Sequence, residues 1–171
     1  MAEMISLLDA DRAPLGRTVE RGTKLREGEH VLVVHVCVFN SRGELLIQQR
    51  SQNKKSYPGF WDISAAGAVR AGETGREAAV RETREELGLC VTLQDGAAVT
   101  LAFPGGSDDF FLTRADAPLS DLTVQTEEVQ DVRWATREEI CAMLHAGEFA
   151  PYWESFLRLL FDLNENLGLR E

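Results

Sequence analysis

Glu82, Glu85 and Glu86 constrain the fold of this chain more than any other feature of its sequence. They have the i, i+3, i+4 spacing that places side chains on one side of an α-helix. Like charges so placed destabilise a helix by about 0.2–0.5 kcal/mol per pair. Two explanations stay open from the helix alone. The face is solvated and relieved by Arg81 and Arg84, or it holds Mg²⁺ or Mn²⁺, which prefer hard carboxylate oxygens.

Capping residues predict where this helix begins and ends. Thr74 with Glu77 three positions later is a capping-box signature, so we expect the helix to begin near Gly75. Gly88 is suited to follow the last turn, because glycine readily adopts the left-handed conformation in which many helices end. The glutamates therefore lie on a helix with defined ends.

Short apolar segments around this helix are typical of strands. Segment 30–40 is rich in valine, and a Ser-Arg-Gly turn joins it to a second strand at 44–51, which predicts a hairpin. Further extended segments are expected at 60–69, 90–94, 97–103, 108–114 and 129–135, with one or two short strands within 4–27.

Two more helices are expected near the end of the chain. The first covers 137–147 and ends in a glycine. The second covers 151–168, with Pro151 as its first residue. Its apolar face comprises Trp153, Leu157, Leu160 and Phe161. Strands with interspersed helices predict an α/β sandwich around a mixed sheet, and a length of 171 residues suits one domain over 1–171.

Charge and cysteine content limit the classes of partner and compartment. A net charge of −10 argues against a nucleic-acid backbone or an anionic membrane as the main partner, but not against small phosphorylated molecules. Cys37, Cys90 and Cys141 are far apart and have no metal-ligand spacing, which indicates reduced thiols in a cytoplasmic protein. Residues 1–16 lack a signal-peptide pattern, and no apolar run approaches the ~20 residues of a membrane span.

The spacing of residues 67–89 identifies a family resemblance. This stretch resembles the Nudix box, G-x5-E-x7-R-E-U-x-E-E-x-G-U, in which U is an apolar residue. Every fixed position matches, and Thr83 at the first U is the single departure. The resemblance implies a Nudix-type α/β/α sandwich around a mixed sheet. It also implies an enzyme that hydrolyses a diphosphate bond, using Mg²⁺ or Mn²⁺, in a nucleoside diphosphate derivative or another small organic diphosphate.

The same resemblance implies a role for each fixed residue. The metal ligands and catalytic residues would be Glu82, Glu85 and Glu86. Glu85 is also a candidate for activating the attacking water. Glu73 and Arg81 would pair and brace the loop against the helix, Gly67 would offer a carbonyl near the metal, and Gly88 would end the helix.

Residues 39–73 are similar to isopentenyl diphosphate isomerases and to isomerase-like Nudix hydrolases. In that branch, basic residues at the positions of Arg50 and Lys54 contact the substrate diphosphate. The isomerases also need a cysteine and a histidine where this chain has Ala66 and Ala68, so the resemblance favours hydrolysis over isomerisation. A non-catalytic binding module is a second alternative, but such modules tend to lose box glutamates, and this chain keeps all of them.

Several properties stay open at the level of sequence. The catalytic base is Glu85 or one of four other acidic residues: Asp108, Asp109, Glu127 and Glu128. His35 is expected in the core or in the substrate pocket. The substrate, the number of metal ions and the oligomeric state, a homodimer included, are not determined.

Overall fold

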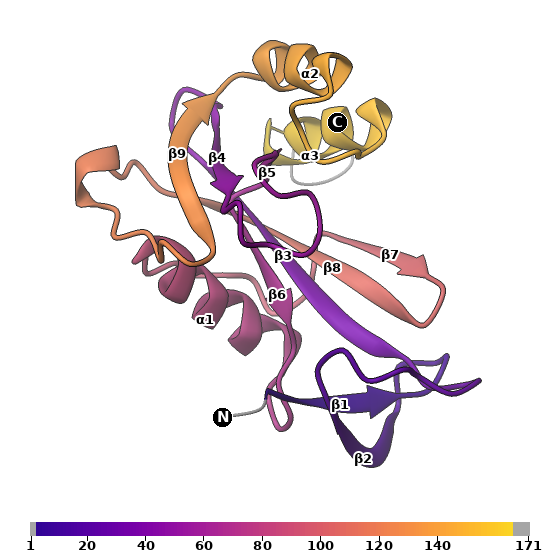
Figure 1. Ribbon diagram of the computed structural model, residues 1–171. Coiled ribbons are helices and arrows are strands. Elements are labelled where there is room, and N and C mark those ends of the chain that lie inside the picture. Colours follow the sequence, from indigo (N-terminus) through magenta and orange to yellow (C-terminus); the bar gives the residue numbers. More distant parts are fainter. Residues whose placement is uncertain (1–2, 166–171) are drawn as a thin grey trace.

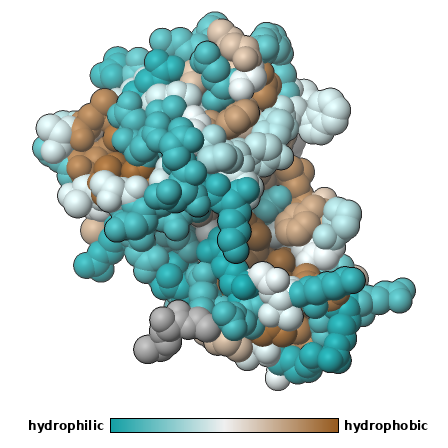
Figure 2. Space-filling view, in the orientation of Figure 1, coloured by the Kyte–Doolittle hydropathy of each residue, from teal (hydrophilic) through white to brown (hydrophobic). Residues whose placement is uncertain are grey.

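The computed structural model describes residues 3–165 and contains a seven-stranded mixed sheet between two layers of helix (Figure 1). No helix in this described part is long and apolar enough to cross a membrane. Hydrophilic side chains cover most of the face seen in Figure 2, in keeping with the net charge of −10. The elements in chain order are β1 (Met4–Leu8), β2 (Pro14–Glu20), β3 (Val31–Phe39), β4 (Leu45–Arg50), β5 (Trp61–Asp62), β6 (Ala65–Ala68), α1 (Gly75–Leu87), β7 (Val99–Phe103), β8 (Gly106–Arg114), the 3₁₀ helix η1 (Leu119–Asp121), β9 (Val129–Ala135), α2 (Arg137–Ala146) and α3 (Glu154–Glu165).

Strand β3 is the central strand of the sheet. It pairs in parallel with β8 along its whole length, from Val31↔Gly106 to Phe39↔Arg114, and β7 pairs antiparallel with the far edge of β8. The other edge of β3 pairs with β6 and, at its end, with β4, which also pairs with β5 and β9. The expected β3–β4 hairpin is therefore confirmed at its turn, although β4 pairs mainly with β9. Strands β1 and β2 form a separate antiparallel sheet.

Alternating side chains of β3 explain why the sheet is buried on both faces. Val34, Val36 and Val38 pack in the core that α1 covers. Cys37 and Phe39 point the opposite way, into the core that α2 and α3 cover. A strand buried on both faces needs a continuous apolar sequence, which the valine-rich segment supplies. The expected α/β/α sandwich around a mixed sheet is confirmed (Figure 1).

Helix α1 has both of its predicted caps. The Thr74 hydroxyl accepts a hydrogen bond from the backbone N–H of Glu77 at 3.2 Å, and the Glu77 carboxylate accepts one from the backbone N–H of Thr74 at 2.8 Å. Gly88 follows with φ of 67°, the left-handed conformation expected of it. Helix α2 begins with the same motif at Thr136 and Glu139, which the sequence analysis overlooked although the spacing is identical.

One expected strand was wrong, and one expected helix, α3, is present but begins later than expected. Residues 90–94 form no strand, because Leu93 is buried and its carbonyl accepts a hydrogen bond from Arg76 of α1, so the segment packs beside the helix instead of pairing with the sheet. Helix α3 begins at Glu154 rather than Pro151, because the chain stays extended through Ala150, whose N–H donates to the carbonyl of Trp61. Trp153 consequently lies outside the apolar face and is 84% exposed. Positions 166–168 of the expected helix lie outside the described residues.

Candidate active site

Strand β6 and helix α1 meet at Gly67. A Cβ atom on this glycine would lie 2.1 Å from the carboxylate carbon and from Oε1 of Glu82. Real Cβ atoms essentially never approach another atom so closely, so a larger residue at position 67 would displace the Glu82 carboxylate from its place on the β6 backbone. The first fixed glycine of the 67–89 pattern is thus explained by packing.

Of the three glutamates predicted to bind metal, Glu82 and Glu86 are buried, and burial changes their pKa values. Burial, together with the nearby negative charge of Glu82, raises the pKa of Glu86 to about 8. Glu86 Oε2 accepts hydrogen bonds from the Gln48 side-chain amide at 2.9 Å and from the Ala66 N–H at 3.3 Å. Burial also raises the pKa of Glu82, while the Arg81 guanidinium opposes this effect. The site therefore favours protons or other positive charge.

Glu85 has a different environment. Its side chain is 40% exposed, and both of its oxygens accept hydrogen bonds from Arg70 at 3.1 Å. Arg81 donates to Glu85 at 3.2 Å, to Glu82 at 2.6 Å and to both oxygens of Glu73 at 2.7 and 2.8 Å. The expected pairing of Glu73 with Arg81 is therefore present, and it ties the loop before α1 to the helix.

The three glutamates share a helix side, but they do not surround one point. Glu82 and Glu86 face the sheet, whereas Glu85 turns toward the arginines. Within residues 3–165, no group of three or more His, Cys, Asp or Glu side chains is arranged around a position for a metal ion. Joint metal ligation by all three glutamates therefore stays a prediction.

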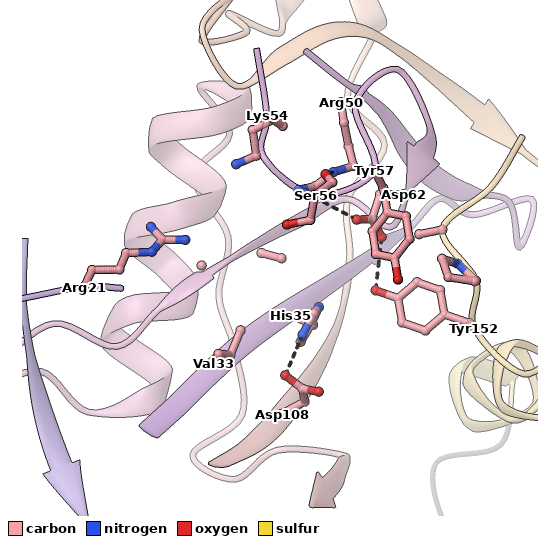
Figure 3. A pocket seen from close by; sticks show the side chains of 14 residues that line it. Arg21, Val33, His35, Arg50, Lys54, Ser56, Tyr57, Asp62, Asp108 and Tyr152 are labelled. Atoms are coloured by element: carbon pink, nitrogen blue, oxygen red, sulfur yellow. Dashed lines mark hydrogen bonds and ion pairs between the residues drawn. The ribbon is translucent and has the colours of Figure 1, made fainter. Parts of the chain in front are cut away.

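A cleft of about 390 Å³ opens beside Gly67, and both predicted substrate-binding residues line it (Figure 3). Arg50 is nearly buried, and its guanidinium donates to Asp62 at 3.1 Å and to the carbonyl of Ser56 at 3.0 Å. Lys54 forms an ion pair with Glu128. The cleft that Arg50 and Lys54 line thus adjoins the buried Glu82 at Gly67 and the buried Glu86 at Ala66. Such an arrangement can bind an anion next to a cation.

Asp62 and Tyr152 are site residues that the sequence analysis missed. The carboxylate of Asp62 is buried, and it accepts hydrogen bonds from Arg50 and from the Tyr152 hydroxyl at 3.0 Å. Burial raises the pKa of Tyr152, so its hydroxyl stays protonated and keeps donating. An aspartate between Trp61 and Ile63 was the available signal, because a charge inside an apolar strand requires a partner.

The structure separates the four alternative candidates for a base. Asp108 lines the cleft and is hydrogen-bonded with His35 Nε2 at 3.0 Å, so of the two locations expected for His35, the core and the pocket, the pocket is the one observed. Asp109 points to the opposite face of β8, where it pairs with Arg12 at 2.5 Å. Glu128 holds Lys54, and Glu127 is exposed. Asp108 and Glu128 therefore adjoin the cleft, and the other two do not.

Ala66 and Ala68 occupy the positions at which isomerases need a cysteine and a histidine. Ala66 lines the cleft and offers no ionisable group. Cys37, on the strand β3 that pairs with β6, is fully buried in the core, and burial raises its pKa. It therefore offers the cleft neither a thiolate nor an accessible thiol.

Comparison with known proteins identifies relatives of this chain by sequence and by structure. The NUDIX domain model matches residues 29–158. An uncharacterized Nudix hydrolase of Listeria innocua is 49% identical over 158 residues, which are 92% of this chain and 92% of that protein. An isopentenyl-diphosphate Delta-isomerase of Escherichia coli is 25% identical over 156 residues, 88% of this chain and 84% of that protein. A crystal structure from Deinococcus radiodurans has a TM-score of 0.75 at 27% identity, covering 92% of this chain and 99% of that one.

The contact at Gly67 predicts a specific sensitivity. Gly67→Ala should lower the free energy of unfolding by about 1–3 kcal/mol, because the new methyl group overlaps the Glu82 carboxylate. Gly96→Ala is the matched control, since a Cβ there would meet no atom within 4 Å. Urea denaturation of both variants measures the difference, and equal stabilities would contradict the packing explanation.

The raised pKa of Glu86 predicts a pH dependence of stability in the metal-free protein. Between the ordinary carboxyl pKa and about 8, the folded state holds a proton that the unfolded state releases, so this group's contribution to stability falls as pH rises. Glu86→Gln removes the contribution. The Tm of the variant minus that of the wild type should therefore increase from about pH 5 to about pH 8 in chelator-treated buffer. A difference that does not change with pH would contradict it.

Proposed function

Because the chain belongs to the NUDIX domain family of hydrolases, we propose that it hydrolyses a diphosphate bond in a nucleoside diphosphate derivative or another small organic diphosphate. The observation that supports this most is that the buried carboxylates of Glu82 and Glu86 adjoin the basic cleft. Hydrolysis of a diphosphate must neutralise negative charge on the phosphoryl oxygens and supply an attacking water. The two halves of the site suit these two tasks.

The inferred cofactor is a divalent cation, Mg²⁺ or Mn²⁺. Glu86 is buried and its hydrogen-bond donors are neutral, namely the Gln48 amide and the Ala66 N–H, so its carboxylate is available to a hard cation. Glu82, Glu85 and Glu86 would hold the metal. When bound, it would stabilise charge on the phosphoryl oxygens and lower the pKa of a bound water. The number of ions is left open.

Arg50 and Lys54 would bind the diphosphate. Asp62 and the Ser56 carbonyl already fix the Arg50 guanidinium, so little side-chain freedom remains to be lost on binding. Glu85 is the first candidate for the base that accepts a proton from the attacking water, with Asp108 and Glu128 as alternatives beside the cleft. A small molecule is the proposed partner, rather than a nucleic acid or a membrane.

Isomerisation is the second candidate, and similarity to the Escherichia coli isomerase at 25% identity is the observation in its favour. Moving a double bond in a homoallylic diphosphate requires an acid and a base on opposite faces of the carbon skeleton. Ala66 supplies neither, and the Cys37 thiol is enclosed by the core. A non-catalytic binding module is disfavoured because all four box glutamates are kept. Hydrolysis is therefore the preferred function.

Substitution of the proposed base tests catalysis directly. Glu85→Gln preserves the shape of the side chain and removes its charge, and it should lower kcat by about 10²-fold or more in the presence of Mg²⁺. Formation of the monophosphate products from a panel of diphosphates, followed by liquid chromatography, is the measurement. Asp95→Asn removes a fully exposed carboxylate elsewhere and should leave kcat unchanged. Near-wild-type turnover by Glu85→Gln would refute its role.

The basic loop offers a matched pair of lysines. Lys54→Ala should raise KM about tenfold while changing kcat less, because a diphosphate contact present in both the ground and transition states is uniform binding. Lys55 is its exposed neighbour and does not line the cleft, so Lys55→Ala should leave KM unchanged. Equal KM values for both variants would exclude Lys54 from substrate binding.

A further inference from the structure

Tyr57 is an exposed aromatic residue in the lining of the cleft. It belongs to the loop that carries Lys54, it is 48% exposed, and it is among the side chains labelled around the cavity in Figure 3. Its ring has one aromatic neighbour outside that lining, Phe60, at 5.8 Å and edge-on. A ring so exposed contributes little to the core, so its location calls for another explanation.

The backbone at Tyr57 is strained. Its φ is +49°, in the left-handed region that L-residues other than glycine, asparagine and aspartate rarely adopt. The following residue is Pro58, which further disfavours a helical conformation before it. Strain of this kind persists where the surrounding structure over-determines it, often at a ligand site.

The adjoining turn does not require a tyrosine at this position. The Phe60 N–H donates to the Tyr57 carbonyl at 3.3 Å, and Gly59 has φ of 76°, which is the pattern of a type II turn with Pro58 and Gly59 at its centre. Proline and glycine supply the geometry of that turn. The residue that precedes them only lends its carbonyl, which any amino acid has.

Hydrogen bonds on both sides fix the loop relative to Arg50. The Arg50 side chain donates to the Ser56 carbonyl at 3.0 Å, immediately before Tyr57. The Gly59 N–H donates to the Arg50 carbonyl at 3.0 Å, and the Gly59 carbonyl accepts from Gln49 at 2.9 Å. The backbone that carries Tyr57 is therefore fixed beside the residue proposed to bind the diphosphate.

We propose that Tyr57 determines specificity by stacking on a planar ring of the substrate while Arg50 and Lys54 hold its diphosphate. This inference rests on the proposed function and narrows it to diphosphates that carry an aromatic base, as opposed to an aliphatic chain. His35 and Asp108 on the cleft wall support that choice. An aliphatic chain would remove these polar groups from water without replacing their hydrogen bonds, whereas a nucleoside offers partners for them.

Two non-hydrolysable ligands separate the contribution of the Tyr57 ring to binding from that of the diphosphate contacts. The first is α,β-methylene-ADP, and the second is methylenediphosphonate, which has the same bridged phosphorus centres and no nucleoside. Isothermal titration calorimetry with Mg²⁺ gives both dissociation constants. Wild type should bind the nucleoside analogue more tightly. Tyr57→Asn should weaken that binding about tenfold, the order expected for one lost base–aromatic stack, and leave methylenediphosphonate binding unchanged.

Asparagine is chosen because it tolerates the left-handed conformation. Thermal unfolding should therefore show Tyr57→Asn at least as stable as the wild type, so that affinity falls without loss of the fold. Tyr57→Phe and Tyr57→Trp keep a ring and should retain affinity. Trp153→Ala removes a more exposed aromatic that does not line the cleft, and it should change neither dissociation constant.

The outcomes separate this inference from the function on which it rests. Three outcomes would overturn the stacking role. Tyr57→Asn weakens the binding of both ligands equally, it weakens the binding of neither, or the wild type binds the two ligands with equal affinity. If no diphosphate tested gives monophosphate products while ring-dependent binding is retained, the proposed hydrolysis is overturned and the stacking role stays in place.

Discussion

The close approach of α1 to β6 at Gly67 is the contact on which the rest of the site depends. Because this glycine has no side chain, the carboxylate of Glu82 lies on the strand, and the helix settles close enough for Glu86 to reach the Ala66 N–H. Both carboxylates are then buried beside the cleft, where loss of hydration favours their neutral forms. Burying the two carboxylates lowers the stability of the fold, and packing on both faces of the sheet offsets that loss. The same burial creates a region that attracts positive charge.

Arg81 limits the cost of burying these charges. Its guanidinium contacts Glu73, Glu82 and Glu85, and it also donates to the Ala68 carbonyl at 3.1 Å, so one side chain joins the loop, the helix and the strand. Its carboxylate partners raise the pKa of Arg81, although burial opposes this, and its charge is permanent. Glu86 has no such partner at hydrogen-bond distance. Burial, with the nearby charge of Glu82, raises its pKa to about 8.

The sequence predicted those parts of the molecule that depend on residues close together in the chain. The capping box at Thr74 and the valine-rich β3 are local patterns, and both were confirmed. The start of α3 and the segment 90–94 were wrong, because contacts with distant elements decide them. In the site, Asp62 and Tyr152 were missed for the same reason: they are 90 residues apart, and no local pattern joins them.

The glutamates also differ in how easily they can exchange partners. The pair between Arg70 and Glu85 is about 40% exposed at each end, and exposed ion pairs contribute only about 0–1 kcal/mol. The pair between Arg81 and Glu82 is nearly buried, and breaking it would leave an uncompensated charge in the interior. Glu85 is thus the one box glutamate that can leave its arginines at little cost. A residue proposed both to hold a cation and to accept a proton from water needs that freedom, whereas Glu82 is better suited to a fixed position against Gly67.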